Sequence, residues 1–189
     1  MLTNQTACHL VETAADAVQS DADRFRDVLD GIPAPIYVTD AEGTISYFNP
    51  PCVELAGRTP TVGQDKWCVT WKLYTADGEP LPHDECPMAV TLRDRKPVRD
   101  VEAIAERPDG TMFRFVPFPM PLFDAGGELT GAVNLLMDVS GQRSPAYLEE
   151  QAAQCRRLAA VSSDRTIAKS MLRIADKYEQ QSRKLARPD

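Results

Sequence analysis

The chain has 189 residues, a mass of 20.9 kDa, a net charge of −7 and an isoelectric point near 4.9. This length allows one core of ordinary size with a short helical appendage, and it excludes two full catalytic domains. The acidic balance argues against a nucleic-acid binder, whose affinity comes mostly from neutralised phosphates. No apolar run reaches the roughly 18 residues that cross a bilayer, and no secretion signal opens the chain. We therefore expect a cytoplasmic protein that binds neither nucleic acid nor membrane.

The cysteines are odd in number and lack paired C-x-x-C spacing, which argues against a disulfide framework and against a zinc ribbon. A closed zinc site would need four ligands, and the chain holds only two histidines. We expect reduced, mostly buried thiols. The five are Cys8, Cys52, Cys68, Cys86 and Cys155.

The first elements are a helix and a β-hairpin. Alanines and apolar residues recur at helical spacing over residues 6–29, and Gly31 and Pro33 follow, so we expect an N-terminal helix that ends there. Residues 36–40 and 44–48 then predict two strands joined by a tight turn.

Short helices and a loop follow the hairpin. Residues 51–56 predict a short helix that Gly57 ends, and the Pro- and Gly-rich stretch from there to His83 predicts a loop with short turns. Pro87 suits the first turn of a further helix, which must end before Pro97.

Three strand-like runs come next, at residues 98–106, 111–123 and 129–138. Turn-forming residues separate them, at positions 108–110 and 124–127. The predicted order is therefore two strands, short helices and three strands.

The last 50 or so residues differ in composition, being rich in Ala, Arg, Gln, Glu and Lys, and they predict helices over residues 145–161 and 164–185. Each helix carries an apolar stripe that could pack within a helical hairpin or on the sheet, pair with a second copy, or bind a partner protein. The stripes are Tyr147, Leu148, Ala152, Cys155, Leu158 and Ala159, then Ile167, Met171, Ile174, Tyr178 and Leu185.

Several local signatures share one order and spacing. Asp40, Gly43 and Ile45, followed by Asn49, form a D-x-x-G-x-I…N pattern, and Gly57 follows the first short helix. Further signatures are the segments 81–89 and 106–110 and the triplet Asp138, Val139 and Ser140. Together they resemble the PAS domain family, and particularly PAS modules of bacterial sensory proteins.

The resemblance implies an α+β fold, with a five-stranded antiparallel sheet, short helices on one face and flanking N- and C-terminal helices. It divides the chain into an N-terminal helix (1–31), a PAS domain (32–141) and a C-terminal helical segment for output or assembly (142–189). Asp40, Gly43, Asn49 and Gly57 would form structural turns, and residues 138–140 would join the last strand to the output helix.

Such domains often enclose a small ligand. The residues expected to line the pocket are mostly aromatic or apolar, although large aromatics also fill ordinary cores. Asn134 stands out in an apolar strand because its buried amide needs a partner, either a ligand or the backbone. The candidates are Tyr37, Phe48, Trp67, Trp71, His83, Met88, Leu92, Phe113, Phe115 and Asn134.

His83 and Cys86 lie three residues apart and could share one face of a helical turn. In haem-binding members of the family such groups ligate the iron, which makes haem one candidate cofactor; the alternative is a histidine that caps a loop beside a buried cysteine. The flavin-photoreceptor motif G-x-N-C-R-F-L-Q is absent, so we expect no flavin chemistry.

Motifs for catalysis are missing, including phosphate-binding loops, a nucleophile elbow and H-E-x-x-H. The C-terminal region contains no histidine for phosphorylation. We therefore expect a non-enzymatic sensor or relay that responds to a small ligand or a signalling partner, passing a change in packing to its C-terminal helices. The alternatives are a haem-dependent sensor and a ligand-free dimerisation scaffold.

Overall fold

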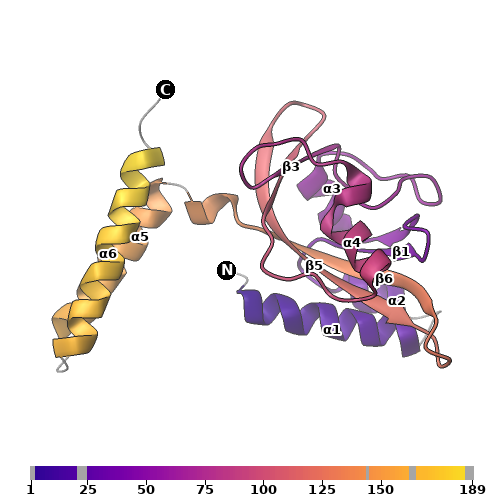
Figure 1. Cartoon of the computed structure of the whole chain (residues 1–189), viewed down its shortest axis with the longest axis horizontal. Coiled ribbons are helices and arrows are strands. Elements are labelled where there is room, and N and C mark those ends of the chain that lie inside the picture. Colours follow the sequence, from indigo (N-terminus) through magenta and orange to yellow (C-terminus); the bar gives the residue numbers. More distant parts are fainter. Residues whose placement is uncertain (1–2, 21–24, 144, 162–164, 186–189) are drawn as a thin grey trace. The chain divides into compact units, whose positions relative to one another are not determined.

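The computed structural model describes residues 3–20, 25–143, 145–161 and 165–185. The chain forms two compact units, Met1–Asp138 and Val139–Asp189. The first contains the sheet and the second contains two long helices (Figure 1).

The first unit is built on a six-stranded antiparallel sheet with the order β2-β1-β6-β5-β4-β3. Two long strands, β5 and β6, lie at its centre and carry most of the pairing. The strands are Ile36–Asp40 (β1), Ile45–Phe48 (β2), Lys72–Thr75 (β3), Ala103–Glu106 (β4), Met112–Phe123 (β5) and Leu129–Asp138 (β6).

The sixth strand is the main difference from the sequence prediction. The segment containing β3 is predicted as loop, but Lys72–Thr75 pairs with β4 in a register that sets Lys72 opposite Glu106. Lys72 and Glu106 are 34 residues apart in sequence, so local patterning does not reveal the pairing. Strand β4 is also shorter than predicted, beginning at Ala103 rather than at residue 98.

The N-terminal region forms two helices rather than the one predicted over residues 6–29; residues 21–24 lie outside the described part of the chain. Helix α1 (Asn4–Ser20) packs on β5 and β6, on the face of the sheet opposite α3 and α4 (Figure 1). Its buried residues are mostly alanines, which allow a close approach to the strands. Helix α2 (Phe25–Asp30) contacts β2, where the rings of Phe25 and Tyr47 meet edge to face.

Three short helical segments lie on the inner side of the sheet, and two of them, α3 and α4, contribute buried residues to the core. They are α3 (Pro50–Ala56), the 3₁₀ turn η1 (His83–Glu85) and α4 (Pro87–Asp94). Pro87 occupies the first turn of α4, as predicted, and the backbone of Gly57 turns left-handed (φ 63°) to end α3. These elements enclose the main core against β1, β5 and β6.

The second unit begins with the 3₁₀ turn η2 (Ser140–Arg143) and continues as α5 (Pro145–Val161) and α6 (Arg165–Leu185). The two helices form an antiparallel hairpin, because Arg156 pairs with Asp176 and Glu179 while Ser182 contacts Glu149 at the other end. None of the helices within the described residues is long and apolar enough to cross a membrane.

Candidate functional site

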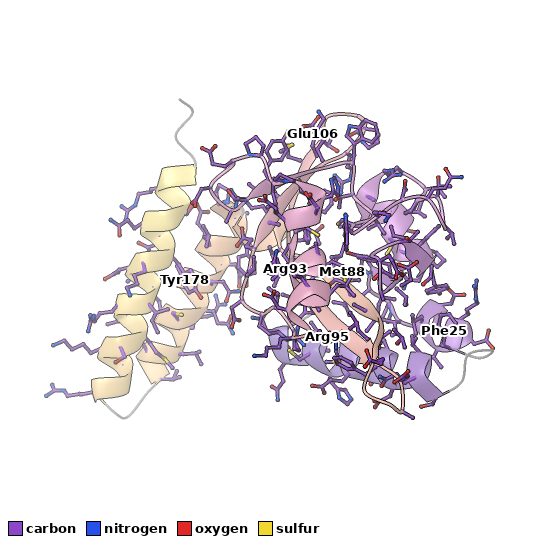
Figure 2. The ribbon with its side chains drawn as sticks, turned by 45° about the vertical axis from the view of Figure 1, so that its right-hand side comes forward. Phe25, Met88, Arg93, Arg95, Glu106 and Tyr178 are labelled. Carbon is purple, nitrogen blue, oxygen red and sulfur yellow. The ribbon has the colours of Figure 1, made fainter. Side chains whose placement is uncertain are left out.

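The candidate site is the interior between the sheet and α4. Tyr37, Met88, Leu92, Phe113 and Phe115, five of the predicted pocket residues, are all buried in one core cluster here. They come from β1, α4 and β5; Met88 is labelled on α4 in Figure 2. Two further predicted residues, Phe48 and Trp67, pack against the same cluster while staying partly exposed.

A chain of hydrogen bonds crosses this apolar interior. The backbone N–H of Phe118 donates to Oδ1 of Asn134 at 2.9 Å, and Nδ2 of Asn134 donates to the Tyr37 hydroxyl at 3.0 Å. That hydroxyl donates to the Trp67 carbonyl at 2.9 Å. We call this set, from Phe118 through Asn134 and Tyr37 to Trp67, the interior polar chain. The partners that the buried Asn134 amide requires are therefore protein groups, one from the backbone and one a tyrosine.

Trp67 enters the site through its backbone. Its φ is 69°, a left-handed conformation that is uncommon for a residue with a side chain. The backbone N–H of Trp67 donates to the Gly43 carbonyl at 2.8 Å, and a Cβ added at Gly43 would overlap the indole ring. The indole therefore rests directly on the hairpin turn, where Oδ1 of Asp40 accepts a hydrogen bond from the Thr44 N–H.

The other two predicted turn residues connect neighbouring elements. Asn49 is fully buried; its Oδ1 accepts from the Ile36 N–H, and its Nδ2 lies within hydrogen-bond distance of the carbonyls of Leu29 and Ala34, and of a third at Ile32. It thereby ties β1 to the segment that follows α2. At the end of α3, a Cβ on Gly57 would lie 2.8 Å from the Arg107 side chain.

Buried thiols adjoin the interior polar chain. The Cys86 thiol lies 4.0 Å from the same Trp67 carbonyl, and the Thr70 hydroxyl donates to the Cys68 sulfur at 3.2 Å. Burial raises the pKa of Cys86 to about 12. Burial also raises the pKa of Cys52, which is fully enclosed beneath β1. Because the thiolate is the nucleophile, the raised pKa values of Cys52 and Cys86 disfavour the reactive form of these two thiols in this packing.

His83 and Cys86 contact different groups. The Nε2 of His83 lies 3.3 Å from the Thr70 carbonyl, and burial lowers the pKa of this half-buried imidazole. Cys86 points to the Trp67 carbonyl instead. No cluster of three or more histidines, cysteines or carboxylates suited to a metal occurs in the part of the chain that the structure describes. Both groups are engaged in protein contacts, and haem is an alternative that a spectrum must test.

Trp71 does not belong to the interior. Its side chain is 51% exposed and lines a separate groove beside β3, together with Tyr74 and His83. The expectation that Trp67 and Trp71 face one cavity is therefore wrong, because Trp71 directly precedes β3, the edge strand of the sheet, and is exposed there. Sequence analysis also missed this groove. It missed, too, that the Trp67 backbone carbonyl accepts the hydrogen bond of the Tyr37 hydroxyl, because a pattern of side chains gives no signal for a backbone contact.

The junction predicted to relay a signal lies where the two units meet in the chain. Asp138 is the last residue of β6, Val139 is buried, and Ser140 begins η2. Asn134 is four residues before this end, on the same central strand. The interior polar chain and the start of the helical unit are thus joined by a single β-strand.

The strand order β2-β1-β6-β5-β4-β3, with short helices over one face, defines an α+β domain built on one antiparallel sheet. A model of the PAS domain family matches residues 33–141. The chain belongs to the PAS domain family.

Solved structures agree with this fold. The RsLOV d2 variant is 16% identical with a TM-score of 0.50, over 89% of this chain and 99% of that one. The PAS domain of the fruit-fly ELK potassium channel is 17% identical with a TM-score of 0.51, over 64% and 98% of the two chains. No curated protein sequence matches the chain.

Proposed function

We propose that this protein is a sensor or signal-relay module that couples the packing of its interior to its C-terminal helices. One observation carries the proposal: the interior polar chain runs through Asn134, and the strand that holds Asn134 continues directly into the helical unit. A small ligand or a partner protein that rearranges Tyr37 or Asn134 would then shift β6.

The proposed mechanism is an equilibrium between two packings. A ligand can drive such an equilibrium only as far as its affinities for the two states differ. Within the interior, the Tyr37 hydroxyl is the group best placed to exchange partners, since it accepts from Asn134 and donates to a backbone carbonyl. Burial raises the pKa of Tyr37 well above its usual value, so the exchange would involve a neutral phenol. No covalent chemistry is required, and we propose that the chain is not an enzyme.

The proposed output surface is the α5–α6 hairpin. Its described interior is small, since the buried residues of α5 are Leu148, Ala152 and Ala159 and α6 adds Ala175 and Ser182. Larger apolar side chains are left in solvent, among them Leu158 and Ile174. We propose that a second copy or a signalling partner covers them, in the setting of bacterial cytoplasmic signal transduction.

Hydrogen–deuterium exchange of the full chain tests the coupling. Tyr37→Phe deletes the hydroxyl that links Asn134 to Trp67, and we expect altered exchange in β6 and in α5. Tyr74→Phe is the matched control, because it also deletes one hydroxyl hydrogen bond of the same sheet, to Glu106. Changes that stay within β1 and β6 in the Tyr37 variant would contradict the relay.

The nature of the ligand requires a separate measurement. We expect the natively purified protein to lack a Soret band and to gain none with hemin, since His83 and Cys86 are engaged in protein contacts. A sharp band that His83→Ala or Cys86→Ala alters would instead establish haem sensing. Native mass spectrometry of the same sample reports a colourless ligand directly; its absence, with normal coupling, would favour a protein partner as the signal.

A further inference from the structure

A groove of about 380 Å³ lies at the outer edge of the sheet, along β3. Its walls are largely aromatic rings and prolines, and the polar side chains at its rim are Lys72 and His83. Glu106, labelled in Figure 2, lies on β4 beside this edge. The apolar lining consists of Trp71, Leu73, Tyr74, Pro80, Leu81 and Pro82. We call this feature the β3 groove.

The backbone at this edge is already paired. The Leu81 N–H donates to the Leu73 carbonyl at 2.9 Å, and the Thr75 N–H donates to the Glu79 carbonyl at 2.8 Å. Pro80 and Pro82 have no N–H to offer to another strand. A partner therefore cannot simply extend the sheet here, and recognition must come from side chains, chiefly the exposed indole of Trp71.

The charges around the β3 groove are unbalanced. Lys72, the only cationic side chain that lines the groove among the described residues, is held in an ion pair with Glu106, and nearby Arg58 is paired with Asp65. Burial lowers the pKa of His83, which leaves the imidazole neutral at pH 7. By contrast, exposed carboxylates flank the lining residues in sequence and make no ion pair within the described residues. They are Asp77, Glu79, Asp84 and Glu85.

We propose that the β3 groove binds a basic, arginine-containing segment of a partner protein. A guanidinium is planar and stacks on an aromatic face, and Trp is the strongest of the aromatic partners. The surrounding carboxylates match its charge and would speed its approach. This inference is independent of the interior relay, since the groove shares none of the residues of the interior polar chain.

The experiment follows the two indole N–H signals of the ¹⁵N-labelled full chain by NMR. The probe is the peptide acetyl-Gly-Arg-Gly-Arg-Gly-amide, and its counterpart carries citrulline, which is similar in shape but uncharged, at both arginines. We expect the Trp71 signal to shift saturably with the arginine peptide, the Trp67 signal to stay in place, and the citrulline peptide to bind at least about fivefold more weakly.

Variants complete the test. Trp71→Ala should weaken binding about fivefold without unfolding the protein, because the indole is half in solvent. Glu79→Gln with Glu85→Gln should weaken binding and flatten its dependence on salt. Met112→Ala, which removes a side chain 52% exposed outside this groove, is the control and should change nothing. Equal binding of the two peptides, or no shift at Trp71, would overturn the proposal while leaving the exchange result at Tyr37 unaffected.

Discussion

Two buried asparagines show how single residues organise the PAS fold of this chain. Asn49 satisfies only backbone groups, and so it fixes the path of the chain between α2 and β1. Asn134 instead connects a backbone N–H to the hydroxyl of Tyr37, which in turn reaches Trp67. The first amide is a structural tie, whereas the second is part of a side-chain network that another partner could rearrange.

Gly43 gives the first prediction at this scale. Its φ is 80° and the Trp67 ring occupies the space of a Cβ, so Gly43→Ala should cost more than about 2 kcal/mol of unfolding free energy. Gly78→Ala is the matched control: φ is 92° there, but nothing lies within 4 Å of an added Cβ. Urea unfolding, monitored by tryptophan fluorescence, measures the free energy of unfolding of both variants. Equal losses would show that the contact with Trp67 adds no further cost to an alanine at position 43.

The thiols predict a dependence of stability on pH. Burial raises the pKa of Cys86 from the usual 9.0 to about 12, so the unfolded chain loses this proton first. The contribution of Cys86 is therefore complete below about pH 9 and declines as the pH rises towards 12. Urea unfolding at each pH measures the free energy of unfolding. We expect this free energy to fall less between pH 7 and pH 10 in Cys86→Ala than in wild type. Cys8→Ala, at a partly exposed position, should match wild type.

At the scale of elements, the sheet is covered on both faces by helices of different origin. Alternate residues of β6 point to opposite sides, so that Ala132 and Leu136 join the core beneath α4 while Val133 and Leu135 face away from it. Helix α1 covers that second face. The N-terminal helix is thus an integral layer of the first unit.

Helix α1 is predicted to be required for stability. Val11 is fully buried, and Val11→Asp would place a charge with no partner against the sheet, costing about 3 kcal/mol or more. Thr13→Asp puts the same charge on an exposed position of the same helix and should cost little. Thermal unfolding by circular dichroism compares the two; similar melting temperatures would mean that α1 is dispensable.

At the scale of the molecule, the first unit has a full core and the helical hairpin has a small one. Among the side chains that the structure describes, the contact between α5 and α6 buries Leu148 and three alanines, and Arg156 adds ion pairs to Asp176 and Glu179. Exposed ion pairs of this kind contribute about 1 kcal/mol or less. Ile167 and Leu185 of the predicted stripe lie outside the side chains that the structure describes, and the exposed Leu158 and Ile174 are the basis of the proposed assembly role.

Sedimentation velocity tests that role. We expect the full chain to self-associate through the hairpin, and Leu158→Glu with Ile174→Glu to shift it towards the monomer, because both side chains are large, apolar and exposed. Arg157→Glu and Lys177→Glu make a matched control, since they put acidic residues on the same two helices at positions already polar and exposed. A monomeric wild-type chain would exclude the second copy and leave a partner protein as the occupant.

Short sequence patterns were enough to predict the PAS family, the tight turn around Gly43, the start of α4 at Pro87 and the helical character of the C-terminal region. These features depend on residues close together in the chain, and sequence patterns record them directly. Tertiary structure decided the rest: the pairing of β3 with β4, the exposure of Trp71, and the partners of Asn134. Tyr37 and Asn134 are 97 residues apart, so their hydrogen bond exists only because β1 and β6 pair, and side-chain patterning along the chain does not encode such a meeting.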